Sequence, residues 1–117
     1  IFLLAPTSTP SRRRLVAEES HGFVYYVSLT GITGAKLSNV TDIQQNVQKL
    51  KKVSASPVAV GFGVATPEDA AQVSKMADGV IVGSAIVKRI ASHQQDPGMV
   101  GHVAEFVRSL KSAMARA

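Results

Sequence analysis

The sequence predicts an α/β domain in which four parallel strands alternate with helices. Four short apolar runs, each followed by a helical pattern, divide the 117 residues into units of about 30 residues. The runs at residues 58–64 and 79–88 are rich in β-branched residues, reach a glycine and then open a helix. Continuous apolar runs of this length are typical of parallel strands that are buried on both faces.

The first two units follow this order. Residues 1–5 predict the first strand, and Thr9 is placed to cap a helix over residues 10–20 that has proline at its first position. Residues 23–28, rich in aromatic and β-branched side chains, predict the second strand. Residues 29–40 show no clear period. A connection of this length predicts a loop of the kind that often acts as a mobile lid.

The next two helices have recognisable start signals. Thr41 and Gln44 have the spacing of a capping box and predict the start of the second helix. The third strand is expected at residues 58–64. Thr66, followed by proline and two acidic residues, predicts the start of the third helix. The apolar faces of these two helices consist of Ile43, Val47, Leu50, Ala70, Val73 and Met76.

The last unit carries two helices after its strand. The fourth strand is expected at residues 80–82, and Ser84 opens a short helix that runs to Ile90. Residues 94–98 interrupt the helical pattern with proline and glycine. A last amphipathic helix follows, and its apolar face consists of Val103, Phe106, Val107, Leu110 and Met114.

Four parallel strands fit either a small open doubly wound sheet or half of an eight-stranded (β/α)8 barrel. No G-x-G-x-x-G fingerprint follows the first strand, as a dinucleotide-binding doubly wound sheet would require. The glycine-ended third and fourth strands, with the short helix at Ser84, are typical of the phosphate site of such barrels. We therefore predict that residues 1–117 form the carboxyl-terminal half of one TIM (β/α)8 barrel domain, strands five to eight, with an extra short phosphate-binding helix.

Composition excludes several classes of function. The chain has no cysteine, which rules out disulfides and thiolate metal sites. The net charge of +5 is spread along the chain, and only six residues are aromatic, so we expect no nucleic-acid partner. No apolar run is long enough to span a bilayer, so we expect no membrane partner either. Three histidines lack a partner pattern for a metal and are assigned to surface or capping roles: His21, His93 and His102.

Gly63 and Gly83 both end predicted strands ahead of helices. Glycine lets a ligand approach the backbone closely, and the following helix offers unpaired N–H groups and its positive dipole end. Two such ends side by side would hold a phosphate, and Ser84 can act as both cap and ligand there. For Gly61, inside the strand, a packing role and a ligand role are equally plausible.

Two aromatic positions stay open on spacing alone. Tyr25 and Tyr26 alternate across a strand, so one faces the barrel interior and the other faces the helices. Phe62 fits either a core position or a pocket wall.

Three segments occur in order at the spacing of one known family: residues 23–34, residues 60–64 and residues 83–88. In these segments the sequence closely resembles the carboxyl-terminal half of the alpha subunit of tryptophan synthase, and the resemblance covers essentially the whole chain. It implies cleavage of indole-3-glycerol phosphate to indole and glyceraldehyde 3-phosphate. It also implies a beta subunit partner in an alpha2-beta2 complex, with pyridoxal phosphate belonging to the beta subunit and no cofactor here. The implied location is the cytoplasm, or the plastid in a plant.

The resemblance also implies residue roles. The substrate phosphate would be held by Gly34, Gly63, Gly83 and Ser84. The indole pocket would be lined by Tyr25, Phe62 and Ile81. The lid that closes over substrate would include Gly31 and Thr33. Many members carry arginine where this chain has Leu29, so no charge-based lid contact is carried over to this position.

The reaction is a retro-aldol-type cleavage and needs an acid and a base, so paired carboxylates are expected. None of the eight acidic residues ends a predicted strand, and Asp42, Glu68 and Asp69 occupy first helical turns. The resemblance implies that the catalytic carboxylates lie in the amino-terminal half. We therefore expect no catalytic residue in this segment and no activity from it alone. A stand-alone lyase that releases indole and a non-catalytic phosphate-binding half barrel are the alternatives.

A half barrel also exposes two unpaired strand edges and an apolar interior. We expect isolated residues 1–117 to dimerise, aggregate or stay partly molten.

Overall fold

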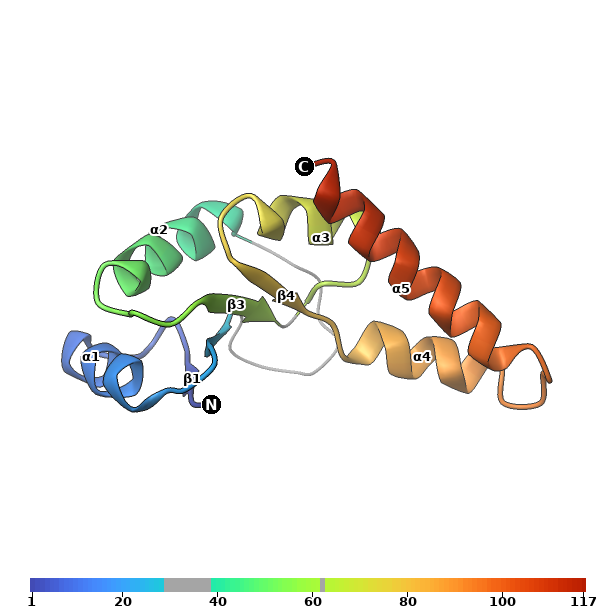
Figure 1. Cartoon of the computed structure of the whole chain (residues 1–117), viewed down its shortest axis with the longest axis horizontal. Helices are drawn as coiled ribbons and strands as arrows, with labels where there is room; N and C mark the ends of the chain where they lie inside the picture. The colour runs from blue at the N-terminus through green and yellow to red at the C-terminus, as the bar shows by residue number, and fades with distance from the viewer. Residues whose placement is uncertain (29–38, 62) are drawn as a thin grey trace.

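A computed structural model of the chain describes residues 1–28, 39–61 and 63–117 (Figure 1). Its four strands are parallel and lie in the order in which they occur along the chain. They are β1 (Leu3–Leu4), β2 (Val24–Val27), β3 (Val58–Gly61) and β4 (Gly79–Ile81). Helices alternate with the strands, so the predicted α/β arrangement of four βα units is confirmed.

The two faces of the sheet differ in burial. Val24 pairs with Val58 and Tyr26 pairs with Val60 in the register of β2 and β3, and all four are at most 2% exposed. Their side chains belong to the core that the helices cover. The alternate residue Tyr25 faces the other side and is only half-buried. The spacing left the choice between the two tyrosines open, and the helix-covered side belongs to Tyr26.

Three helices supply much of that core: α1 (Pro10–Glu19), α2 (Val40–Lys51) and α3 (Pro67–Ser74). The Thr9 hydroxyl accepts a hydrogen bond from the Arg12 N–H, which confirms the predicted cap of α1. At α3, Thr66 and Asp69 form a capping box, as the start signal predicted. The predicted apolar face of α2 is confirmed, because three of its residues are almost completely buried: Ile43, Val47 and Leu50.

The start of α2 differs from the sequence prediction. The helix begins at Val40, with Asn39 as N-cap, so the predicted capping box of Thr41 and Gln44 is wrong. Asn39 adopts a left-handed conformation with φ of 58°, which asparagine tolerates better than most residues. Its carbonyl accepts hydrogen bonds from the Asp42 and Ile43 N–H groups, and its side-chain amide donates to the Asp42 carboxylate. The predicted loop at 29–40 lies almost entirely outside the described residues.

The bounds of the strands also differ from those that the apolar runs predict. The first strand covers Leu3–Leu4 rather than residues 1–5, because this edge strand has one neighbour only. The third ends at Gly61 rather than at residue 64, and the fourth is Gly79–Ile81 rather than 80–82. Apolar periodicity continues into the turns that pack beneath the sheet, which explains why it overestimates strand length.

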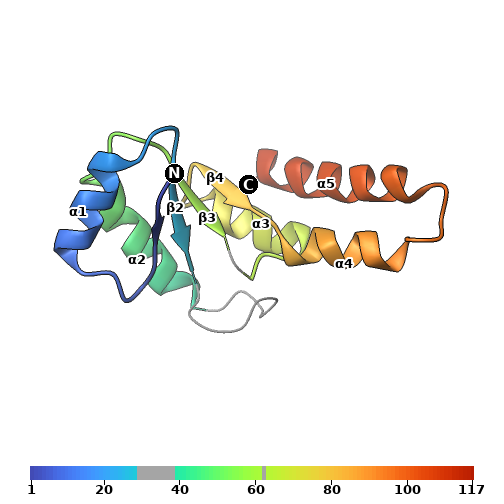
Figure 2. The same ribbon diagram turned by 90° about the horizontal axis from the view of Figure 1, so that it is seen from below.

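The last two helices form a hairpin that extends beyond the sheet (Figure 2). They are α4 (Ser84–Ser92), which has no buried residue, and α5 (Met99–Ala115), which buries Phe106 and Leu110. Val107, predicted on the apolar face of α5, is 42% exposed. The radius of gyration is 15.1 Å, against about 13 Å for a compact domain of this length. The hairpin therefore makes the molecule elongated.

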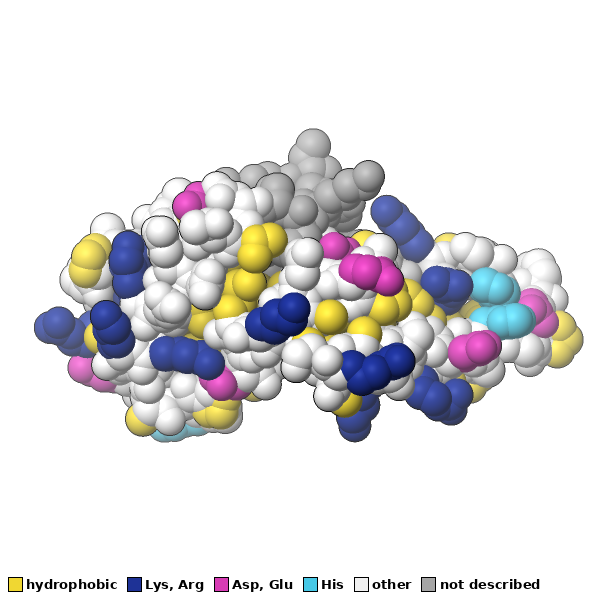
Figure 3. Space-filling view, turned by 90° about the horizontal axis from the view of Figure 1, so that it is seen from above, with side chains coloured by type: hydrophobic (Ala, Val, Ile, Leu, Met, Phe, Trp, Pro, Cys, Tyr) yellow, Lys and Arg dark blue, Asp and Glu magenta, His cyan; other side chains and the backbone are white. Residues whose placement is uncertain are grey.

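The surface carries no single basic patch on the face shown in Figure 3, where Lys and Arg side chains are dispersed over several elements. Among the residues that the structure describes, no helix combines the length and apolarity needed to cross a membrane.

Candidate functional site: a cavity at the start of helix α4

A cavity of about 820 Å³ lies where the chain leaves β3 and β4 and enters α4. Five of the residues that the sequence analysis singled out line it: Tyr25, Gly63, Ile81, Gly83 and Ser84. They come from three separate segments of the chain, and the parallel sheet brings their ends to the same side. Gly31, Thr33, Gly34, Phe62 and Leu29 lie outside the described residues.

Gly63 and Gly83, which follow β3 and β4, differ in whether the local structure requires glycine. Gly63 has φ of +84°, a left-handed conformation in which a side chain would be strained. Gly83 is the N-cap of α4, and a Cβ built on it meets nothing within 4 Å. Packing among the residues that the structure describes therefore does not require glycine at position 83. Ser84 is the first helical residue, so the alternative that Ser84 is the cap is wrong.

The start of α4 differs from the start of α3. The first turn of α3 contains two acidic residues, and its N–H groups are capped by Thr66 and Asp69. At α4 no side chain in the described part of the chain makes a cap hydrogen bond, and the first turn contains no acidic residue. The unpaired N–H groups and positive dipole end of α4 therefore remain available to an external anion.

The apolar wall of the cavity is built around Tyr25. A Cβ on Gly61 would lie 2.6 Å from both the Cε2 and the hydroxyl oxygen of Tyr25, and 3.0 Å from the Cβ of Ile81. Gly61 thus leaves room for the tyrosine ring across β3, which favours the packing role over the ligand role. Tyr26 is 2% exposed on the opposite face, where burial raises the pKa of its phenol.

Other lining residues were missed by the sequence analysis. Lys88 and Arg89, in the middle and the last turn of α4, add positive charge to the cavity, and the Arg89 guanidinium carbon lies 4.4 Å from the centroid of the Phe106 ring. Their spacing of four and five residues from Ser84 on a helix could have indicated this placement.

Among the described residues, the cavity lining contains no Asp or Glu. Asp78, at the start of β4, instead accepts hydrogen bonds of 2.9 Å from the Val58 N–H and from the Lys51 ammonium group. The bond from Val58, with a further contribution from Lys51, holds the pKa of Asp78 below its ordinary value. This carboxylate therefore connects β3, β4 and α2, and it does not line the cavity.

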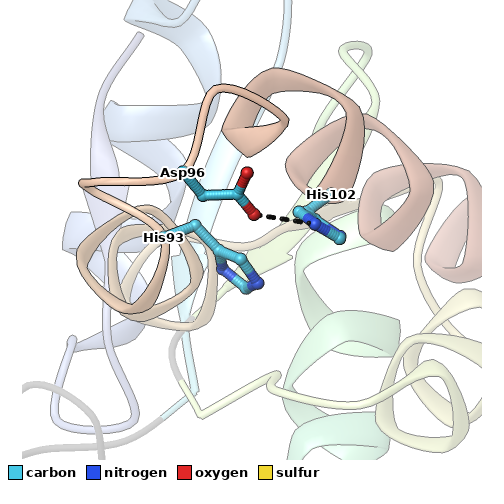
Figure 4. Close-up of side chains that lie close together, drawn as sticks. All are labelled: His93, Asp96 and His102. Carbon is cyan, nitrogen blue, oxygen red and sulfur yellow. Dashed lines mark ion pairs between the residues drawn. The ribbon is translucent and has the colours of Figure 1, made fainter.

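The histidines differ from the sequence analysis, which assigned them no partners. His93 is the C-cap residue of α4, so its capping role is confirmed, but its ring also stacks on that of His102 with centroids 4.4 Å apart (Figure 4). His102 lies 3.0 Å from the Asp96 carboxylate. The signal in the sequence is the pair of histidines on either side of a proline and glycine turn that contains an aspartate.

Comparison with known proteins gives a consistent result. The sequence model of the family "Tryptophan synthase alpha chain" matches residues 1–115. Curated relatives with this name include those of Nitrosococcus oceani, 44% identical over 115 residues, and Gloeobacter violaceus, 47% identical over 114 residues. Each alignment covers 97% of this chain but only 42% and 41% of the relative. The chain thus spans less than half the length of these relatives.

Solved structures agree. The structure of tryptophan synthase subunit alpha from Legionella pneumophila superposes with a TM-score of 0.83 at 30% identity, covering 99% of this chain and 42% of that one. A structure of tryptophan synthase from Mycobacterium tuberculosis gives a TM-score of 0.81 at 39% identity, covering 97% and 40%. The four βα units match part of a larger barrel, and the chain belongs to the tryptophan synthase alpha chain family.

Proposed function

We propose that this chain supplies the phosphate-binding end and part of the indole pocket of a lyase that cleaves indole-3-glycerol phosphate. In this proposal it is the carboxyl-terminal half of the barrel. The observation that carries the proposal is the uncapped start of α4, which faces a cavity lined by Gly63 and Gly83.

The phosphate would sit against the first turn of α4. The backbone N–H groups there are the donors, Ser84 adds a hydroxyl, and Lys88 adds positive charge at the cavity wall. Gly83 leaves the space that a phosphate oxygen would occupy, since a Cβ built on it meets no atom of the described residues within 4 Å beyond its own chain neighbours. Gly34, from the family resemblance, would complete the phosphate site.

The indole would occupy the apolar side of the same cavity. Tyr25 in β2 and Ile81 in β4 line it from the two sides of β3, on the face opposite to the helix-covered core. Phe62 would add to this wall, and Gly31 and Thr33 would belong to a lid. An aromatic ring at this place gives a planar substrate a large contact area at low entropic cost.

The acid and base would come from outside this chain, because no carboxylate lines the cavity among the described residues. We propose that the chain alone does not turn over substrate. The whole protein would pass its indole to a beta subunit in a cytoplasmic alpha2-beta2 complex, and pyridoxal phosphate would be bound by that partner. The same lack of carboxylates favours, as a second candidate, a phosphate-binding module without catalysis.

The test uses an exchange chimaera, in which this chain replaces the matching segment of the Gloeobacter violaceus relative. Gly83→Leu fills the space beside α4 and should weaken glycerol 3-phosphate binding, measured by calorimetry, by about tenfold or more, because it displaces charge-assisted hydrogen bonds. Gly101→Leu is the matched control, since a Cβ at Gly101 also meets nothing within 4 Å but lies on α5 away from the cavity.

Equal affinities of the two variants would contradict the role given to Gly83. If the unmodified chimaera binds glycerol 3-phosphate but does not cleave indole-3-glycerol phosphate, the second candidate function is supported instead.

A further inference from the structure

The turn between α4 and α5 brings together two imidazoles and a carboxylate. One ligand atom from each of His93, Asp96 and His102 lies within 4.8 Å of the other two. The three side chains point toward one another at the far end of the hairpin (Figure 4), and histidine and acidic side chains gather at the molecular surface there (Figure 3). This group lies at the opposite end of α4 from the proposed phosphate site, although His93 also lines the cavity.

Two of the three side chains, those of His93 and Asp96, are also held by a hydrogen bond to the backbone. The His93 Nδ1 lies 2.8 Å from the Arg89 carbonyl oxygen, and in the tautomer that donates this hydrogen bond the Nε2 lone pair is free. One oxygen of Asp96 accepts a 2.7 Å hydrogen bond from the Gly98 N–H, which leaves its other oxygen 3.0 Å from the Nε2 of His102. Outer contacts of this kind orient metal ligands in proteins.

The backbone of the turn fixes the spacing. The Asp96 N–H donates to the His93 carbonyl at 2.9 Å, the Met99 N–H donates to the Asp96 carbonyl at 3.0 Å, and the His102 N–H donates to the Gly98 carbonyl at 3.1 Å. These bonds join the end of α4 to the first turn of α5. The histidine rings then stack at 4.4 Å with an interplanar angle of 29°.

We propose that His93, Asp96 and His102 bind a divalent transition metal ion of the zinc class, with water in the remaining coordination position. Two imidazoles and one carboxylate are a ligand set that Zn²⁺ and Co²⁺ accept. Metal–ligand bonds near 2.1 Å place tetrahedral ligand atoms roughly 3.4 Å apart. The Asp96 oxygen and the His102 Nε2, 3.0 Å apart, are already near this separation. The His93 ring would reach it by a small rotation of its side chain at the surface.

The bound ion would link α4 to α5 and so stabilise the hairpin. Helix α4 has no buried residue, so few apolar contacts hold it in place. A bond network from His93 at the end of α4 to His102 in α5 would fix the helix whose other end forms the proposed anion site. The expected effect is therefore stabilisation of the hairpin rather than participation in chemistry.

The experiment titrates the 117-residue chain, and in parallel the exchange chimaera, with Zn²⁺ by calorimetry and with Co²⁺ by visible absorption. One equivalent should bind, and His93→Ala and His102→Ala should each weaken binding by at least about tenfold, the lower end of what loss of even an outer contact costs. Zn²⁺ should also raise the melting temperature of the exchange chimaera and not that of the same chimaera with His93→Ala or His102→Ala. The control is His21→Ala, because His21 is the third histidine of the chain and lies outside the group.

All three substituted positions are near or at the surface, so the variants should keep the circular dichroism of the parent. Absence of saturable binding in both proteins would overturn the proposal. Binding that survives in both His93→Ala and His102→Ala, or that is lost in His21→Ala, would overturn it as well. Glycerol 3-phosphate affinity of the His102→Ala variant provides a second readout, because His102 is not among the residues that line the cavity, whereas His93 is.

Discussion

Gly61→Ala should lower the unfolding free energy, because the added methyl group would clash with the ring of Tyr25. The added Cβ would lie 2.6 Å from two atoms of Tyr25, whereas ordinary contact begins at 3.4 Å. The backbone of Gly61 has little freedom to withdraw, since its carbonyl accepts hydrogen bonds from both the N–H and the hydroxyl of Ser28, at 3.0 and 2.9 Å. The Tyr25 ring must therefore move by about 0.8 Å or more, into the cavity that it lines.

Overpacking of this kind costs about 1–3 kcal/mol. We expect about 2 kcal/mol here, because Tyr25 can rotate but the Ile81 Cβ, at 3.0 Å, is fixed to β4. Urea unfolding of the exchange chimaera, followed by circular dichroism, measures the change in unfolding free energy. In a Tyr25→Leu background the same substitution should cost about 1 kcal/mol less, since the two positions are in direct contact.

Gly79→Ala is the matched control for Gly61→Ala. Gly79 lies on the neighbouring strand, and its Cβ would meet the Cβ of Ala59 at an ordinary 3.4 Å. This substitution should change stability by less than about 1 kcal/mol in either direction. The reasoning fails if Gly61→Ala costs no more than Gly79→Ala, or if its cost is the same with and without the Tyr25 ring.

Two further predictions concern stability and association. Because the pKa of Asp78 is lowered in the folded state, the Asp78 carboxylate stabilises the fold fully above the ordinary carboxyl pKa, and this stabilisation is lost as the pH falls below that value. Asp78→Asn should therefore make the unfolding free energy depend less on pH in urea titrations at pH 2–5. If the acid limb of the variant is as steep as that of the parent, Asp78 has no such role. The unpaired edges of β1 and β4 should make the 117-residue chain self-associate or unfold without cooperativity. A compact monomer in sedimentation velocity that also unfolds in one transition with urea would contradict this prediction.

Much of the fold could be read from short stretches of sequence. The start signals at Thr9 and Thr66 depend on residues within three positions of each other, and both predictions are confirmed. The apolar face of α2 depends only on helical period. Asn39 shows where this fails: the spacing of Thr41 and Gln44 predicts a later start, and the left-handed conformation of Asn39, which a spacing rule does not capture, starts the helix at Val40.

The cavity could be anticipated in part. Gly63, Gly83 and Ser84 follow from the rule that strand ends and helix starts meet at one edge of a parallel sheet, and the structure places all three on one cavity. Tyr25 could not be distinguished from Tyr26 by alternation, because either face of an isolated strand can point to the helices. Only the packing of α1 to α3 assigns Tyr26 to the core and leaves Tyr25 for the cavity.

The sequence by itself determined the order of strands and helices, the caps of α1 and α3 and the family, because these depend on local period and on short motifs. The tertiary structure decided which residues meet across the chain: Tyr25 over Gly61, Asp78 on the first N–H of β3, and His93 beside Asp96 and His102. Sheet register sets the first two contacts and results from the packing of segments far apart in the sequence, whereas the backbone of the turn between α4 and α5 sets the third.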